Sequence, residues 1–142
     1  MQEPLITVVG WTGGDVDLTY TRGGHAVAEF RVASTPRSMR QGEWVDRPTV
    51  WYTVKCWRAL AENAAASLRQ GQPVVVHGKL RQESWEAADG RRREKQFIEA
   101  DSVGHDLTFG LTQFRRSESR PRTDHGARDE RPTEREDESP AA

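Results

Sequence analysis

The chain has 142 residues, of which 35% are apolar and 30% are charged, and its sequence pI is near 6.4. This length allows one domain with a real hydrophobic core and is short for two. The near-neutral balance excludes a uniformly basic protein, and no apolar run approaches the length of a membrane span. The single cysteine, Cys56, excludes an intramolecular disulfide framework and indicates a reducing compartment.

Charge is distributed unevenly along the chain. Residues 1–114 carry 14 basic and 14 acidic side chains, residues 115–128 have a net charge of +3, and residues 129–142 have a net charge of −4. From residue 115 onward apolar residues nearly vanish and prolines stand among charges. We therefore predict an ordered domain over residues 1–114 and a disordered charged tail over residues 115–142.

Hydrophobic patterning predicts the elements of the ordered part. Period-two alternation and short apolar runs indicate strands at 6–9 (continued by 17–21), 26–33, 49–57, 73–85 and 96–103. Apolar residues three and four apart predict one helix over 58–69, with Gly71 placed as its C-terminal cap. The polar stretch 35–48 is expected to be a long loop or hairpin tip, and Asp89-Gly90 is a strong hairpin signal. The apolar stretch 107–114 is expected to be ordered.

These elements predict an all-β fold with one short helix. Five strands with a helix between the third and fourth is the element order of an OB-fold barrel, whose second and third strands bind oligonucleotides. The Asp89-Gly90 turn places a protruding β-hairpin between the last two strands. The predicted architecture is thus a five-stranded OB-fold barrel with a protruding hairpin and a disordered C-terminal tail.

The most informative segment is the strand around residues 51–57. Alternate side chains share a face, so Trp51, Thr53, Lys55 and Trp57 lie together, and the other face is apolar. Burying an ammonium between two indoles is unfavourable, so this face is expected to point outward. Bases of a single strand stack on such indoles while the cation meets phosphate. The alternative is a pair of tryptophans buried in the core or at an interface.

Further candidate contacts lie on neighbouring strands. The outward positions of these strands hold one more indole, Trp85, and three cations that can meet phosphates as Lys55 can: Arg31, Lys79 and Arg81. The charged run 91–95, which ends in Lys95, is a further candidate, and an ordinary solvated hairpin is its alternative. Five phosphate contacts would give a logarithmic salt slope of roughly −3.5, at about −0.7 per contact on single strands. A contact between subunits is the alternative role for Trp85.

The sequence offers little to catalysis. The four histidines and one cysteine show no metal-ligand spacing, so no metal or cofactor is expected. Cys56 belongs to the apolar face of its strand, which predicts burial rather than nucleophilic reactivity. No acid pair or triad is evident. We therefore expect a non-enzymatic protein.

Three segments carry a family resemblance. They are residues 8–10 together with 24–33, residues 51–62, and residues 76–81. In this order and spacing the chain resembles bacterial single-stranded DNA-binding proteins over residues 5–105. It is more similar to a secondary paralogue of actinobacterial type than to a principal copy.

The resemblance implies a homotetramer of OB folds that binds and protects single-stranded DNA in replication, recombination or repair. The family's stacking aromatics match Trp51, Trp57 and Trp85. A fourth falls in the loop where this chain reads Pro36–Met39, so that residue is missing, although Trp44 lies nearby and is a possible substitute. In similar actinobacterial proteins the segment after residue 103 adds a strand that clamps two subunits.

The end of the chain departs from the family pattern. Members that recruit replication or repair proteins end in an acidic stretch with a hydrophobic tip, whereas this chain ends in acids followed by Ser139-Pro140-Ala141-Ala142. Partner recruitment through the tail is therefore in doubt. The first residues show no signal peptide, so we expect a cytoplasmic, nucleoid-associated protein with no membrane partner. The alternative function is an OB-fold protein-interaction subunit of a replication-restart or recombination complex, and RNA binding stays open.

Overall fold

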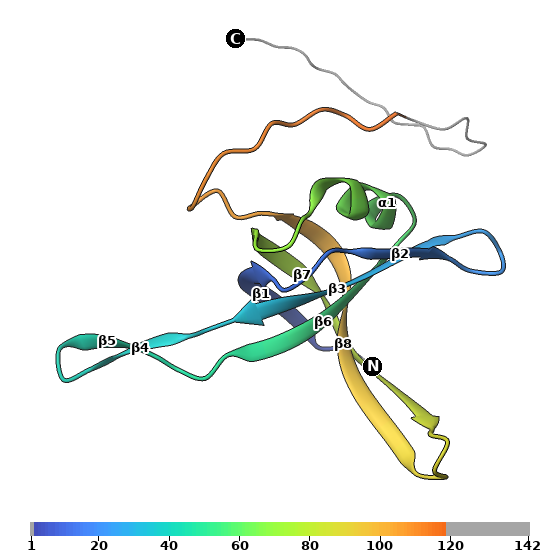
Figure 1. The fold of residues 1–142 in the computed structure, drawn as a ribbon, viewed down its shortest axis with the longest axis horizontal. Coiled ribbons are helices and arrows are strands. Elements are labelled where there is room, and N and C mark those ends of the chain that lie inside the picture. The colour runs from blue at the N-terminus through green and yellow to red at the C-terminus, as the bar shows by residue number, and fades with distance from the viewer. Residues whose placement is uncertain (1, 119–142) are drawn as a thin grey trace.

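The structure is a computed structural model that describes residues 2–118. Within these residues the chain is built of β-strands and a single short helix (Figure 1), as predicted. The elements are β1 (Leu5–Thr12), β2 (Asp17–Tyr20), β3 (Ala26–Ser34), β4 (Arg37–Arg40), β5 (Glu43–Asp46), β6 (Val50–Trp57), α1 (Arg58–Ser67), β7 (Pro73–Glu86) and β8 (Arg92–His105).

The main sheet closes on itself. Its strands follow the order β1-β7-β8-β6-β3-β2, and β1 also pairs with β3 at Trp11 and Thr12. The five long strands β1, β7, β8, β6 and β3 therefore form a ring, while the short β2 extends the other end of β3. Pairing is antiparallel except between β6 and β8, which run parallel where Val54 lies opposite Ile98. Along the chain, α1 stands between the third and fourth of these five strands, which is the element order that the sequence predicted.

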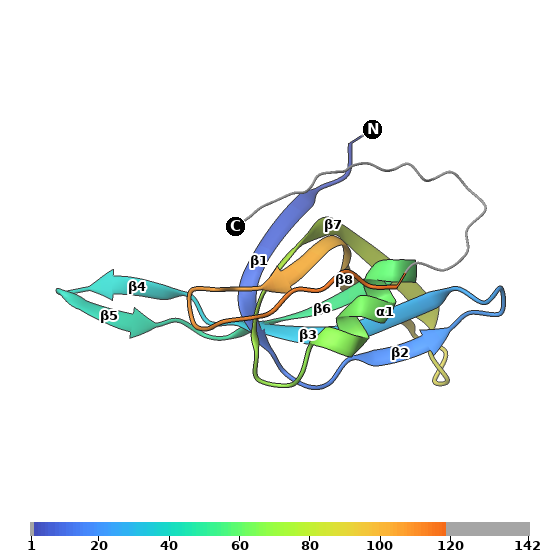
Figure 2. The same cartoon turned by 90° about the horizontal axis from the view of Figure 1, so that it is seen from above.

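Alternate side chains of the ring fill its interior. The buried residues include Phe30 and Val32 of β3 and Ile98 of β8, as well as Val54 and Cys56 of β6. Helix α1 packs against β3 and β6 and lies over one side of the ring in both views (Figures 1 and 2). The apolar faces predicted from the alternation are thus the inner faces.

Two hairpins project from the ring. The stretch expected as a loop or hairpin tip forms β4 and β5, joined by a turn in which Gln41 and Gly42 have φ of 53° and 81°. The outer halves of β7 and β8 form a second arm, whose turn uses Gly90 at φ 83° as the Asp89-Gly90 signal predicted. The two hairpins point away from the ring in different directions (Figure 1).

The helix ends differently from the prediction. It runs over Arg58–Ser67, and its C-terminal cap is Leu68 in an extended conformation. Gly71, predicted as the cap, has φ 82° but lies in the turn that follows. The backbone N–H of Gly71 donates to the carbonyl oxygen of Thr12, so this glycine ties the turn to β1.

Residues 107–118 continue without a helix or strand. They run past α1 (Figures 1 and 2), and their large apolar side chains are exposed, Leu111 at 98%. The stretch 107–114 makes one aromatic contact with the ring, since the Phe109 and Trp11 ring centroids lie 5.1 Å apart. Of the tail predicted to be disordered, residues 119–142 lie outside the described residues.

Candidate nucleic-acid interface

The outer face of β6 carries the two predicted indoles. Trp51 is 47% exposed and Trp57 is 38% exposed, whereas Val54 and Cys56 between them are fully buried. Thr53 and Lys55 are half-buried on the same outer face as the indoles. The alternation read from the sequence is therefore the alternation of the strand, and the indoles lie on the outside of the ring about 20 Å apart.

Trp51 is held by a residue of β3 and by the turn that follows β1. The guanidinium of Arg31, on β3, lies 4.5 Å from the centroid of the Trp51 ring. This cation–π contact contributes about 0.5–1 kcal/mol at an exposed site. The six-membered ring of Trp51 also lies so close to Gly13 that a Cβ there would collide with it. Gly13, which the sequence did not single out, thus fixes the position of the indole.

The third predicted indole lies on the projecting arm. Trp85 is half-exposed near the end of β7, opposite Arg93 of β8. Lys79, Arg81 and Glu83 precede it on the same face of β7. Trp51 and Trp57 thus share one strand, whereas Trp85 lies near the outer end of β7, in the arm that points away from the ring (Figure 1).

Three cations on this outer surface have carboxylate partners. Lys55 Nζ lies 3.0 Å from Glu83 Oε1, and Lys95 Nζ lies 3.4 Å from Glu29 Oε2. Arg81 Nε lies 2.8 Å from a carboxylate oxygen of Glu99. These partners come from strands far apart in sequence, and the sequence reasoning missed them.

Arg31 and Lys79 differ from these three cations. Arg31 packs on the Trp51 indole, and within residues 2–118 neither side chain forms an ion pair. Lys79 is half-buried on β7, in register with Leu5 of β1 and Glu99 of β8. The cations predicted to contact phosphate are therefore of two kinds: those paired with a carboxylate and those without such a pair.

The β4–β5 hairpin carries a further aromatic group. Trp44 is 60% exposed and lies opposite Met39, which is also exposed. The Arg37 guanidinium lies 5.9 Å from the centroid of the Trp44 ring and 3.1 Å from the carboxylate of Asp46. An arginine beside an indole thus occurs on the hairpin as it does at Arg31 and Trp51.

The strand register slips between the ring and this hairpin. Ser34 lies opposite Val50, whereas Arg37 lies opposite Asp46, so the connection from β5 to β6 is one residue longer than the connection from β3 to β4. Opposed and alternate residues share a face, so Trp44 lies on the same face of the hairpin as Arg37, Met39 and Asp46.

Other reactive groups form no site. Burial raises the pKa of the Cys56 thiol to about 11, so it is not a thiolate near neutral pH. Among residues 2–118 no group of three or more His, Cys, Asp or Glu side chains is placed to hold a metal ion.

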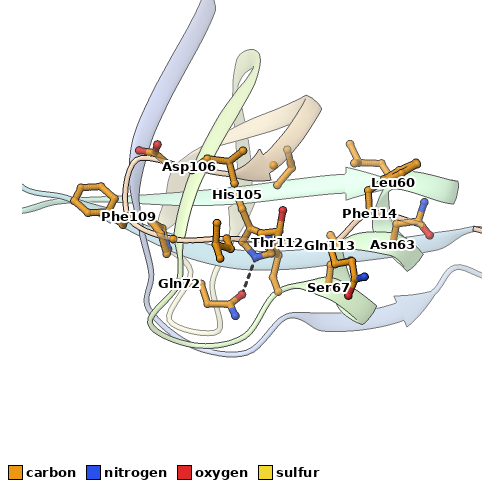
Figure 3. A pocket seen from close by; sticks show the side chains of 18 residues that line it. Leu60, Asn63, Ser67, Gln72, His105, Asp106, Phe109, Thr112, Gln113 and Phe114 are labelled. Atoms are coloured by element: carbon orange, nitrogen blue, oxygen red, sulfur yellow. Dashed lines mark hydrogen bonds between the residues drawn. The ribbon is translucent and has the colours of Figure 1, made fainter. Parts of the chain in front are cut away.

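A cavity of about 550 Å³ lies between α1, the end of β8 and residues 107–114 (Figure 3). Its walls are partly apolar, with Leu60, Phe109 and Phe114 beside polar groups. His105 Nε2 lies 2.9 Å from the side-chain oxygen of Gln72 at its edge. Its lining includes residues of α1 and none of β6.

Comparison with known proteins identifies the family. The sequence model of the Single-strand binding protein family matches residues 5–106, more than half of the chain. The chain belongs to this family. The resemblance noted in the sequence is thereby confirmed, and its closed ring of strands is the OB fold of the family.

Actinobacterial relatives are similar over most of this chain. It is 45% identical over 114 residues to a single-stranded DNA-binding protein of Corynebacterium glutamicum, covering 79% of this chain and 51% of that protein. It is 44% identical over 107 residues to single-stranded DNA-binding protein 2 of Streptomyces coelicolor, covering 74% and 54%. The chain thus spans about half the length of these relatives.

A solved structure agrees on the fold. The small single-stranded DNA-binding protein of Streptomyces coelicolor has a TM-score of 0.68 and 35% sequence identity, covering 78% of this chain and all of that one. The similarity confirms the OB-fold class predicted from the element order. Within the described residues no helix is long and apolar enough to cross a membrane.

Proposed function

We propose that this chain binds single-stranded DNA without sequence preference. The observation that supports this most is the outward position of Trp51 and Trp57 on β6, above a core already filled by Val54 and Cys56. Each base has a π-face that can stack on an indole whatever its identity, and such stacking contributes about 1–3 kcal/mol per base. Arg31 beside Trp51 adds a cation next to the stacking site.

The proposed contacts follow from where each side chain lies. Trp51, Trp57 and Trp85 stack on bases, and Thr53 lines the surface between the first two. The candidate phosphate contacts are four cations, of which Lys55 and Arg81 are paired with carboxylates: Arg31, Lys55, Lys79 and Arg81. Family membership and names of relatives further support single-stranded DNA as the ligand.

The biological role follows from such binding. The protein covers exposed single strands during replication, recombination or repair, in the cytoplasm with the nucleoid, and catalyses no reaction. Residues 1–114 form the binding and assembly domain, and residues 115–142 form a charged tail. Replication or repair proteins are its expected partners.

The direct test is anisotropy of a labelled thymidine oligonucleotide titrated with the protein at low salt. The proposal is supported if a second homopolymer binds with similar affinity and if duplex DNA does not displace the labelled oligonucleotide. An unchanged anisotropy at low salt would overturn it. Capture of a protein partner that survives nuclease treatment, combined with no binding of the oligonucleotide, would instead establish the protein-interaction function.

We further propose that the chain assembles as a homotetramer. Along Leu5–Gly10, β1 pairs with β7 on one side, whereas its pairing with β3 is confined to Trp11 and Thr12. Unpaired strand edges with apolar side chains, such as exposed Leu5, favour pairing with another chain. The exposed apolar residues of 107–114 offer a second contact surface. Light scattering should give four chains per particle, and a single-chain mass would contradict the assembly.

Trp44 is expected to extend the stacking surface onto the β4–β5 hairpin. We predict that Trp44→Ala weakens binding of a long thymidine oligonucleotide about 5-fold, equivalent to about 1 kcal/mol for one stacked base. Val45→Ala is the matched control, because Val45 is the next residue of β5 and faces the other side. Equal affinities of the two variants would show that the hairpin takes no part.

A further inference from the structure

The outer surface of the ring interleaves acids with its cations. Across neighbouring strands, Glu29 lies opposite Lys55, which lies opposite Glu99, which lies opposite Lys79. Opposite charges at such cross-strand positions attract each other. A surface proposed to bind a polyanion thus contains carboxylates in the same rows as its cations.

Lys55 shows the consequence most clearly. It lies on β6 between the two indoles, and yet its side chain is only 19% exposed. Its ammonium is held 3.0 Å from Glu83, two strands away on β7, and 4.6 Å from the centroid of the Phe97 ring. A phosphate that reaches Lys55 has to replace the Glu83 carboxylate.

The other paired cations follow the same rule. Arg81 lies against Glu99 and also 3.0 Å from Glu3 Oε1, and Lys95 lies against Glu29. The Glu83 and Glu29 side chains are 39% and 41% exposed, so each can swing away into water. Displacing them is possible, but it exchanges one carboxylate–cation pair for a phosphate–cation pair and leaves a free carboxylate beside the DNA.

We propose that Glu29, Glu83 and Glu99 are built-in competitors of DNA phosphate for the cations of this surface. The inference rests on the proposed binding of single-stranded DNA to the outer face of β6. While a carboxylate holds a cation, that cation neutralises no phosphate and releases no counterion from the DNA. The electrostatic part of the affinity for DNA is thereby lowered, and stacking on the indoles contributes a larger share of the binding. The DNA strand can then dissociate without a large change in salt concentration.

Counting contacts turns the proposal into a number. Five cations lie on this surface: Arg31, Lys55, Lys79, Arg81 and Lys95. Three of them, Lys55, Arg81 and Lys95, are paired with carboxylates. Two remain to neutralise phosphate. At about −0.7 per contact, the logarithmic salt slope is expected to be about −1.4, rather than the roughly −3.5 that five contacts would give.

The test compares Glu83→Gln with Glu86→Gln. Both substitutions remove one negative charge from β7, but Glu83 holds Lys55, whereas Glu86 is exposed near the end of the arm and forms no ion pair within residues 2–118. Affinity for a thymidine oligonucleotide is measured by anisotropy over roughly 50–200 mM salt. Freeing Lys55 adds one contact, so the slope of Glu83→Gln should be steeper by about 0.7, while Glu86→Gln keeps the wild-type slope.

The steeper slope has a directly measurable effect. Glu83→Gln should bind more tightly than wild type at low salt and lose about 2.5-fold more affinity over a fourfold rise in salt. Glu29→Gln, which frees Lys95, should behave in the same way and serves as an independent second variant. Melting temperatures within a degree or two of wild type would confirm that the variants are folded.

Two outcomes would overturn the inference. One is a wild-type slope in both Glu83→Gln and Glu29→Gln, and the other is weaker binding by Glu83→Gln, which would show that the ion pair positions the arm that carries Trp85. Either result leaves single-stranded DNA binding by the wild-type protein intact. Failure of the wild type to bind at any salt concentration would instead refute the proposed function.

Discussion

Replacing Trp51 and Trp57 together by alanine is expected to weaken single-stranded DNA binding by about 2–6 kcal/mol, or roughly 30-fold to more than 10⁴-fold. Both indoles lie on the outside of β6, so each removal takes away a stacking surface. The core beneath them is formed by other residues, and the variant is expected to stay folded. Anisotropy with homopolymers of different bases measures the loss.

The loss should be similar for every homopolymer, because stacking reads no base edge. A loss confined to one base would argue for hydrogen-bonded readout instead. Tyr20→Ala is the control, since Tyr20 is an exposed aromatic side chain of β2 whose hydroxyl donates to the Glu62 carboxylate of α1. The idea fails if the double variant and the control bind alike.

Gly78→Ala is expected to have the largest effect on stability. Gly78 lies on β7 where the register with β8 shifts by one residue. A Cβ at this position would collide with the carbonyl oxygen of Glu99 and come within 2.7 Å of the Ala100 Cα. Both obstacles are backbone atoms of the neighbouring strand, so the two strands have to separate to admit a methyl group.

We expect this substitution to lower the free energy of unfolding by about 3 kcal/mol or more, at the upper end of the cost of overpacking. For a domain of this size the melting temperature should fall by roughly 10 °C or more. Gly104→Ala is the control, because a Cβ at Gly104 on β8 would meet no atom within 4 Å. Thermal unfolding followed by circular dichroism measures both, and equal melting temperatures would contradict the account.

The sequence was sufficient to predict the ring and the outer face of β6. Period-two alternation separates two faces without any knowledge of neighbouring strands, and the set that contains Lys55 had to face water. The same reasoning placed Phe30 and Val32 inside. These predictions succeeded because each depends on one strand alone.

Contacts between strands were beyond the reach of the sequence. Glu83 meets Lys55 because β7 and β6 lie on either side of β8, and only the strand order reveals this. Gly13 lies under Trp51 because the chain turns back there after β1. The register of the β4–β5 hairpin differs by one residue from that of β3 and β6, and no pattern in the sequence shows this.

The ion pairs of the cations were beyond the reach of the sequence for the same reason. Lys55 and Arg81 were predicted at outer strand positions, and they lie on the outer surface, but each is held by a carboxylate, as is Lys95. A sequence shows which face a cation occupies. The acid that lies two strands away depends on the register between the strands, and a single slip shifts that register by one residue.

Intrinsic tryptophan fluorescence is the most direct measure of base stacking on β6. Saturating the wild-type protein with a thymidine oligonucleotide should quench its emission strongly, and most of that quenching should disappear when Trp51 and Trp57 are replaced. Two results would show that the bases lie elsewhere. One is an unchanged indole emission when the anisotropy of the oligonucleotide reports full binding, and the other is equal quenching in the wild type and the double variant.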